Sequence, residues 1–183
     1  MENRKTQKPI YAICESAVLV GIALALSFIK IPIAALGGSV DFVMVPLFII
    51  CYRRGAFYGT ISGLCFGLLK CIISGGIGWG LLSVLLDYVL AYGAVGVAGF
   101  FKNKSKLIEV SVIVGCFARF LVHFVSGITI YKILVPTAVE GLPFVFSNPF
   151  VYSAVYNSVY MLPNTVIAVI MMAVLRVALK KLK

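Results

Sequence analysis

The sequence has little charge and almost no histidine, and both shortages restrict what the protein can be. Of its 183 residues only 12% are charged, whereas 62% are hydrophobic. A soluble domain carries about 25% charged residues, so we expect a membrane protein. The single histidine, His123, also excludes a histidine-rich metal site.

Motifs for ATP hydrolysis and for common catalytic centres are absent as well. The sequence has no G-x-x-x-x-G-K-[ST] phosphate loop, so we expect no ATPase activity in this chain. It has no H-E-x-x-H or G-x-S-x-G motif, and His123 with Ser126 is the only conceivable base and nucleophile. The two halves show no convincing internal repeat of the kind that many secondary transporters carry. We therefore predict that the chain is not an enzyme.

The five cysteines all lie in apolar runs: Cys14, Cys51, Cys65, Cys71 and Cys116. Free thiols in apolar surroundings behave as small hydrophobic side chains. We expect free cysteines rather than disulfides or a metal site.

Long apolar segments are what the sequence does contain. A bilayer-spanning helix needs about 20 apolar residues. Six candidates lie within a single domain, residues 1–183, at 9–29, 41–52, 56–74, 77–101, 107–131 and 149–178. The second is short and contains Pro46, so we expect it to be bent or tilted. The predicted fold class is an all-α integral membrane protein with six transmembrane helices.

The basic residues alternate along the connections between these segments. Most of the 16 Lys and Arg residues fall at the N-terminus, at 53–54, at 102–106 and in the tail from 176. The other connections carry only Lys30 and Lys132, alongside Asp41 and Glu140. The positive-inside rule then places both termini in the cytoplasm. Because topology accounts for the basic charge, we expect no nucleic-acid partner.

Several polar residues interrupt the apolar segments. Such groups are costly in hydrocarbon, so they usually line a cavity or pair with one another. At a rise of about 1.5 Å per residue, they converge on the outer half of the bundle. We therefore predict a ligand pocket open to the exterior. Its candidates are Trp79, Asp87, Tyr88, Arg119, His123, Tyr152, Tyr156, Asn157 and Tyr160.

Each of these candidates has a functional and a structural interpretation. Asp87 with Tyr88 offers a counter-charge and a π face to a flat cationic ligand, or Asp87 only neutralises Arg119. His123 could line the site or be a satisfied core histidine. Asn157 could bind the edge of a heteroaromatic ring or join two helices.

The first segment carries a strip of small residues, Ala17, Gly21 and Ala25, at intervals of four. Such a strip lets another helix approach closely. The partner could be internal, which base rates slightly favour, or a separate coupling subunit. Glu15 lies near the cytoplasmic side and Lys70 could extend outward to water; we assign neither a role.

In these segments the sequence resembles the thiamine-specific S components of energy-coupling factor transporters. The elements that carry the resemblance are LLDY (85–88), H-x-x-S-G (123–127) and Y-N-x-x-Y-x-x-P (156–163). The segments 37–46 and 52–69 are similar too. The resemblance implies a six-helix protein of the prokaryotic cell membrane that captures thiamine from outside. It also implies a transmembrane coupling subunit and two ATPase subunits as partners.

The same resemblance assigns roles to individual residues. It implies substrate binding by Asp87, Tyr88, His123, Tyr131, Tyr152 and Asn157, and docking of the coupling subunit by Ala17, Gly21 and Ala25. The sequence departs from some relatives, because Leu36 replaces a tryptophan and the loop after Tyr131 lacks an A-P-K-G pattern. The alternatives are an S component for another vitamin and a stand-alone secondary carrier.

Overall fold

The computed structural model describes residues 9–33, 38–76, 80–134 and 148–181, with the side chains of all but 130–134. Within these ranges five helical segments are long and apolar enough to cross a membrane. They are α1 (Pro9–Leu26), α3 (Ala56–Ile73), a helical run from Leu81 to Phe101, α6 (Ile108–Leu134) and α7 (Pro149–Lys181). The described chain is therefore almost entirely helical.

The second predicted span is not a full-length helix. α2 (Met44–Arg54) has 11 residues, which cover about 16 Å at 1.5 Å per residue, against a hydrocarbon core of about 30 Å. Pro46 lies in its first turn, where a missing N–H removes no helical hydrogen bond. Pro46 therefore gives no reason for a bend in α2. Because α2 is too short, six full-length spans are not confirmed.

A β-hairpin precedes α2 and corrects the all-α prediction. β1 (Lys30–Ile33) pairs antiparallel with β2 (Gly38–Asp41), with Lys30 opposite Asp41 and Ile33 opposite Gly38. Ile31 precedes Pro32, a position that disfavours helix and favours extended backbone. The two strands lie almost entirely in the connection between the first two predicted spans, and only Asp41 had been assigned to the second span.

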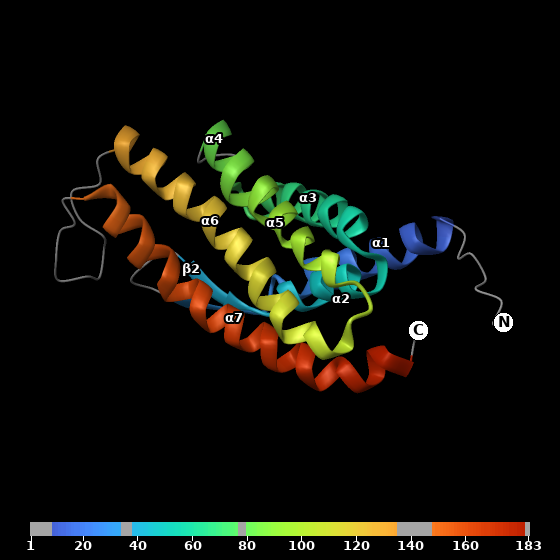
Figure 1. Cartoon of the computed structure of the whole chain (residues 1–183). Coiled ribbons are helices and arrows are strands. Elements are labelled where there is room, and N and C mark those ends of the chain that lie inside the picture. Colours follow the sequence, from blue (N-terminus) through green and yellow to red (C-terminus); the bar gives the residue numbers. More distant parts are fainter. Residues whose placement is uncertain (1–8, 34–37, 77–79, 135–147, 182–183) are drawn as a thin grey trace.

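α2 packs against α1, α3, α7 and the end of the Leu81–Phe101 run. Its side chains Met44, Leu47, Phe48 and Ile50 are at most 2% exposed and form the middle of the apolar core. α6 and α7 pack along each other over much of their length (Figure 1). The hairpin lies against α7, so strand and helix meet beside the polar residues of that helix.

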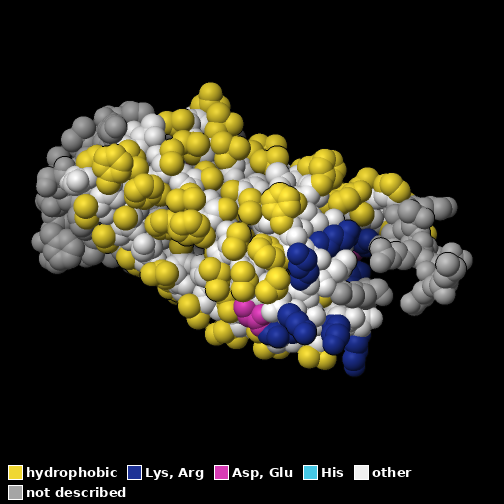
Figure 2. Space-filling model, viewed as in Figure 1, with side chains coloured by type: hydrophobic (Ala, Val, Ile, Leu, Met, Phe, Trp, Pro, Cys, Tyr) yellow, Lys and Arg dark blue, Asp and Glu magenta, His cyan; other side chains and the backbone are white. Residues whose placement is uncertain are grey.

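The outer faces of the long helices are apolar while their inner faces carry the polar residues. On α6, Ile113, Phe117 and Val125 are 51%, 59% and 54% exposed, whereas Arg119 and His123 are each 7% exposed. Figure 2 shows hydrophobic side chains over most of the visible face. This distribution suits a protein whose surroundings are lipid tails.

Lys and Arg side chains gather at one end of the molecule (Figure 2), the end where α1 begins and α7 finishes (Figure 1). Glu15, near the start of α1, forms ion pairs with Arg53 and Arg54 at the end of α2. Glu15 thus joins two helices, which the sequence did not indicate. All five cysteines are free, as predicted.

Candidate functional site

Asp87 lies in a stretch of π-helix, η2 (Val84–Leu90). This stretch is part of a run that starts with α4 (Leu81–Ser83) and continues through α5 (Ala91–Ala94) and the 3-10 helix η3 (Val95–Phe101). A π-helical turn holds more residues than an α-helical one and occurs often at functional sites. The change of pitch sets which face of the run carries Asp87.

Asp87 and His123 face each other across the gap between η2 and α6. His123 Nδ1 lies 3.1 Å from Asp87 Oδ1, and the Ser83 hydroxyl donates to Asp87 Oδ2 at 2.9 Å. The Asp87 side chain is 25% exposed, whereas that of His123 is 8% exposed. The carboxylate therefore has both a buried partner and an accessible edge.

Asn157 of α7 is the third member of this polar group, beside Asp87 and His123. Its Nδ2 donates to the His123 carbonyl at 3.2 Å and to the Ser153 carbonyl at 2.9 Å, and its Oδ1 accepts from the Tyr160 hydroxyl at 2.7 Å. The helix-joining role is therefore present. Direct ligand contact by Asn157 stays a prediction.

Three tyrosines follow one another along α7 next to this group. The rings of Tyr152 and Tyr156 stack with centroids 5.6 Å apart, and Tyr156 meets Tyr160 edge to face at 6.2 Å. Tyr160 in turn meets the His123 ring edge to face at 6.0 Å. The arrangement gives a continuous aromatic surface from Tyr152 to His123.

Arg119 does not pair with Asp87. Its guanidinium carbon lies 4.1 Å from the centre of the Tyr92 ring, and its Nη1 lies 3.0 Å from the Met44 sulfur. The alternative that Asp87 only neutralises Arg119 is therefore wrong, because the carboxylate pairs with His123. Arg119 is instead held by the π face of Tyr92.

Lys70 turns inward, contrary to the prediction that it extends to water. Its Nζ donates to the Tyr92 hydroxyl at 3.0 Å and lies 3.4 Å from Asp41 Oδ2. Its side chain is 16% exposed. The carboxylate at the end of β2 supplies the buried partner that makes this orientation favourable.

Of the other predicted site residues, Tyr88 does not join the group formed by Asp87, His123 and Asn157. Tyr88 lies against the end of α3, where the Ser74 hydroxyl is 3.5 Å from its own hydroxyl. The Tyr131 side chain and all of Trp79 lie outside the described residues. Their proposed roles remain predictions.

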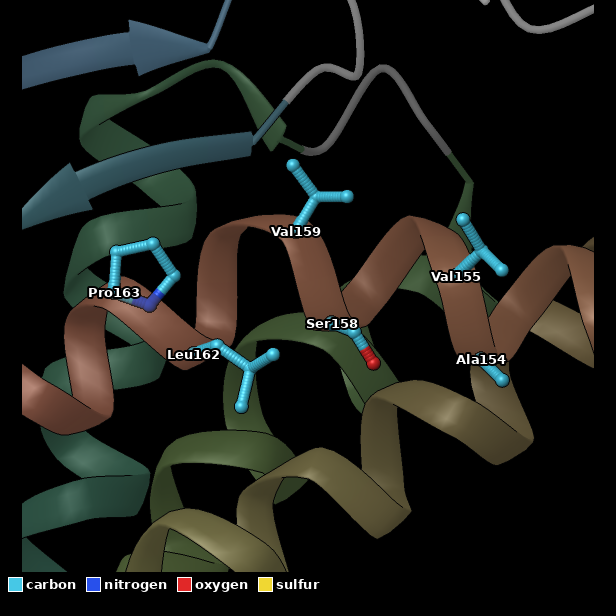
Figure 3. Close-up of a pocket in the computed structure, with 6 residues that line it drawn as sticks. All are labelled: Ala154, Val155, Ser158, Val159, Leu162 and Pro163. Carbon is cyan, nitrogen blue, oxygen red and sulfur yellow. The ribbon is translucent and has the colours of Figure 1, made fainter.

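A surface hollow of about 500 Å³ lies on another face of α7 (Figure 3). Its lining is mostly apolar: Ala154, Val155, Ser158, Val159, Leu162 and Pro163. Leu162 is 64% exposed, which marks this side of the helix as outward-facing. The hollow therefore does not coincide with the polar group around Asn157, which is 3% exposed.

Sequence reasoning missed three residues that the structure adds to the site: Ser83, Tyr92 and Ser153. Ser153 could have been found, because it precedes Asn157 by four residues and thus lies on the same helical face, where its hydroxyl accepts from Asn157 Nδ2 at 3.2 Å. Ser83 precedes Asp87 by four residues, which is also a same-face spacing. Tyr92 had no comparable signal, since Arg119, whose guanidinium lies over its ring, comes from another helix.

The strip on α1 is exposed rather than internal. Ala17, Gly21 and Ala25 all face outward, and a Cβ added at Gly21 would meet no atom within 4 Å. Among the described residues no other helix covers the strip, contrary to the alternative of an internal partner. The face stays open for a separate partner.

Comparisons with known proteins agree with this architecture. Residues 13–183 match the family described as thiamine transporter protein (Thia_YuaJ). The chain is 30% identical to the thiamine transporter ThiT of Bacillus subtilis, over 92% of this chain and 91% of that protein. It is 26% identical to ThiT of Lacticaseibacillus paracasei, over 92% and 88% of the two chains.

A solved structure of ThiT from Listeria monocytogenes has the same fold. The two superpose with a TM-score of 0.81 at 23% identity, over 96% of this chain and 98% of the other. With the membrane-length helices described above, these matches identify a multi-pass protein of the prokaryotic cell membrane. The chain belongs to the thiamine transporter protein family.

Proposed function

We propose that the protein is the substrate-binding S component of an energy-coupling factor transporter and captures thiamine from outside the cell. The observation that carries this proposal is the partly exposed Asp87 carboxylate, paired with the buried His123 beside the α7 tyrosines. Thiamine combines an aminopyrimidine with a cationic thiazolium ring. A carboxylate flanked by aromatic faces suits both parts.

The proposed recognition assigns a role to each residue of the group. Asp87 accepts a hydrogen bond from the aminopyrimidine and offsets the thiazolium charge. Its bond to His123 Nδ1 leaves His123 Nε2, which has no hydrogen-bond partner among the described residues, as a further group for the ligand. Tyr152 and Tyr156 offer stacking faces, and Asn157 offers its carboxamide to the ring edge.

Transport then requires partners. We propose that a transmembrane coupling subunit docks on the exposed strip of Ala17, Gly21 and Ala25, and that two ATPase subunits supply the energy. In this arrangement the basic end of the molecule faces the cytoplasm. α2 serves as the sixth, shortened helix of the bundle, and both termini are cytoplasmic. The chain itself performs no enzymatic reaction.

Calorimetric titration of the purified chain with thiamine tests the proposal. We expect saturable binding of one thiamine per chain without ATP or partner subunits. Matched titrations with a panel of other vitamins provide the specificity control. Saturation by another vitamin with no heat from thiamine would reassign the ligand. Ion-driven uptake by the chain reconstituted alone would instead favour a secondary carrier.

A further inference from the structure

The β1–β2 hairpin is attached to α7 through Asn164. The Asn164 Oδ1 accepts from the Asp41 backbone N–H at 2.9 Å, and its Nδ2 donates to the Ser39 carbonyl at 2.9 Å. The same Nδ2 donates to the Tyr160 carbonyl one turn earlier at 2.8 Å. One carboxamide, 5% exposed, thus joins the edge of β2 to the helical turn that carries Tyr160.

The hairpin also touches Tyr160 directly. A Cβ at Gly38 would lie 2.7 Å from the Tyr160 Cβ and closer still to its ring. Real Cβ atoms do not approach other carbons this closely. Glycine at position 38 therefore leaves the room in which the Tyr160 ring lies, and that ring places its hydroxyl 2.7 Å from Asn157 Oδ1.

A third attachment fixes the other end of β2. Asp41, besides its backbone bond to Asn164, holds Lys70 of α3 through its carboxylate at 3.4 Å. Its Oδ1 also accepts from the Val43 N–H at 3.2 Å. Because Asp41 is 6% exposed, this ion pair is shielded from water. β2 is consequently held from both α3 and α7 and cannot slide along α7 without breaking buried polar contacts.

We propose that the hairpin positions Tyr160 in the ligand site, with Asn164 fixing β2 on α7 and Gly38 leaving space for the Tyr160 ring. Asn164 and Gly38 are positioning residues that act through Tyr160 and its bond to Asn157. This inference rests on the proposed function, because it assigns Tyr160 to the same thiamine site.

A double-mutant cycle tests the Gly38 part. Gly38→Ala should weaken thiamine affinity about tenfold, which corresponds to about 1.4 kcal/mol, because the methyl group displaces the ring. In a Tyr160→Ala background, where that space is empty, Gly38→Ala should cost no further affinity. Equal losses in the two backgrounds would overturn the inference while leaving thiamine capture intact.

Substitutions at Asn164 test the attachment itself, by amide hydrogen exchange of the hairpin in the full chain. Asn164→Leu should speed exchange at residues 38–41 and weaken thiamine binding, and Asn164→Asp, which keeps the acceptor, should speed it less. Thr165→Val is the matched control, because the Thr165 hydroxyl donates within its own helix, to Met161 at 2.8 Å. Unchanged hairpin exchange in Asn164→Leu would overturn the inference.

The exchange measurement needs no ligand, so it separates the two proposals. If the parent chain binds no thiamine, the proposed function is contradicted. The rates of amide hydrogen exchange at residues 38–41 still test whether Asn164 attaches the hairpin to α7. If Asn164→Leu does not fold, Asn164→Asp and Gly38→Ala carry the same comparison.

Discussion

Two strips of small residues have the same four-residue spacing but different surroundings. On α3, Gly59, Gly63 and Gly67 face the helical run Leu81–Phe101, and a Cβ at any of them would meet backbone atoms of that run. On α1, Ala17, Gly21 and Ala25 are exposed, and a Cβ at Gly21 would meet nothing. The same pattern therefore serves internal packing in one helix and leaves an open face in the other.

The comparison also separates two tasks. The α3 strip packs against the segment that carries Asp87. Gly67 lies next to the backbone carbonyl of Tyr88, the residue that follows Asp87. The α1 strip has no contact with the Asp87–His123 pair in the described structure. We therefore expect substitutions near α3 to affect folding and ligand binding, and substitutions on the α1 strip to affect coupling.

The largest expected effect is at Gly63. Gly63→Leu forces a side chain into the Tyr92 carbonyl and Gly93, a backbone contact that cannot yield without moving the helix. Overpacking of this kind costs about 3 kcal/mol or more. Thermal unfolding of the purified protein should show a strongly lowered midpoint or no folded protein. A normal midpoint would remove the distinction between the two strips.

Asp87→Asn should have the next largest effect. The change keeps size but removes the negative charge, so thiamine affinity should fall at least about tenfold, or about 1.4 kcal/mol. Calorimetry measures the affinity, and the unfolding midpoint serves as the control. Full affinity in a well-folded variant would contradict the assignment of Asp87 to the ligand site.

Gly21→Leu should spare binding and reduce transport. The bulky side chain has space in the isolated chain, but it holds a partner helix away. Loss of about 1.4 kcal/mol of docking energy would lower complex formation about tenfold. Uptake of labelled thiamine by cells that carry the coupling subunits measures the effect. Weakened binding together with a lowered unfolding midpoint would mean that the strip is internal packing after all.

Gly21→Ala should have the smallest effect and is the matched control for the leucine variant. Replacing glycine by alanine inside a helix stabilises it by about 0.5–1 kcal/mol, and alanine already occupies the other two positions of the strip. Uptake should stay near that of the parent chain. Loss of uptake would show that the docking contact requires glycine itself.

Sequence periodicity predicted the long helices well but failed where polar contacts cross between elements. Lys70 shows why: its inward orientation depends on Asp41, which lies 29 residues away and is brought close only by the fold. The Asp87–His123 pair could be anticipated as members of one pocket, but not as direct partners. The hairpin was missed because its short strands lie inside a largely apolar, helix-rich sequence.

The sequence by itself determined that lipid surrounds this protein and where its long helices run, because these depend on local hydrophobicity and spacing. The tertiary structure decided which of two similar glycine and alanine strips is covered, which acid pairs with which base, and how the hairpin meets Tyr160. Those outcomes depend on contacts between residues far apart in the chain, and local sequence carries no record of such distances.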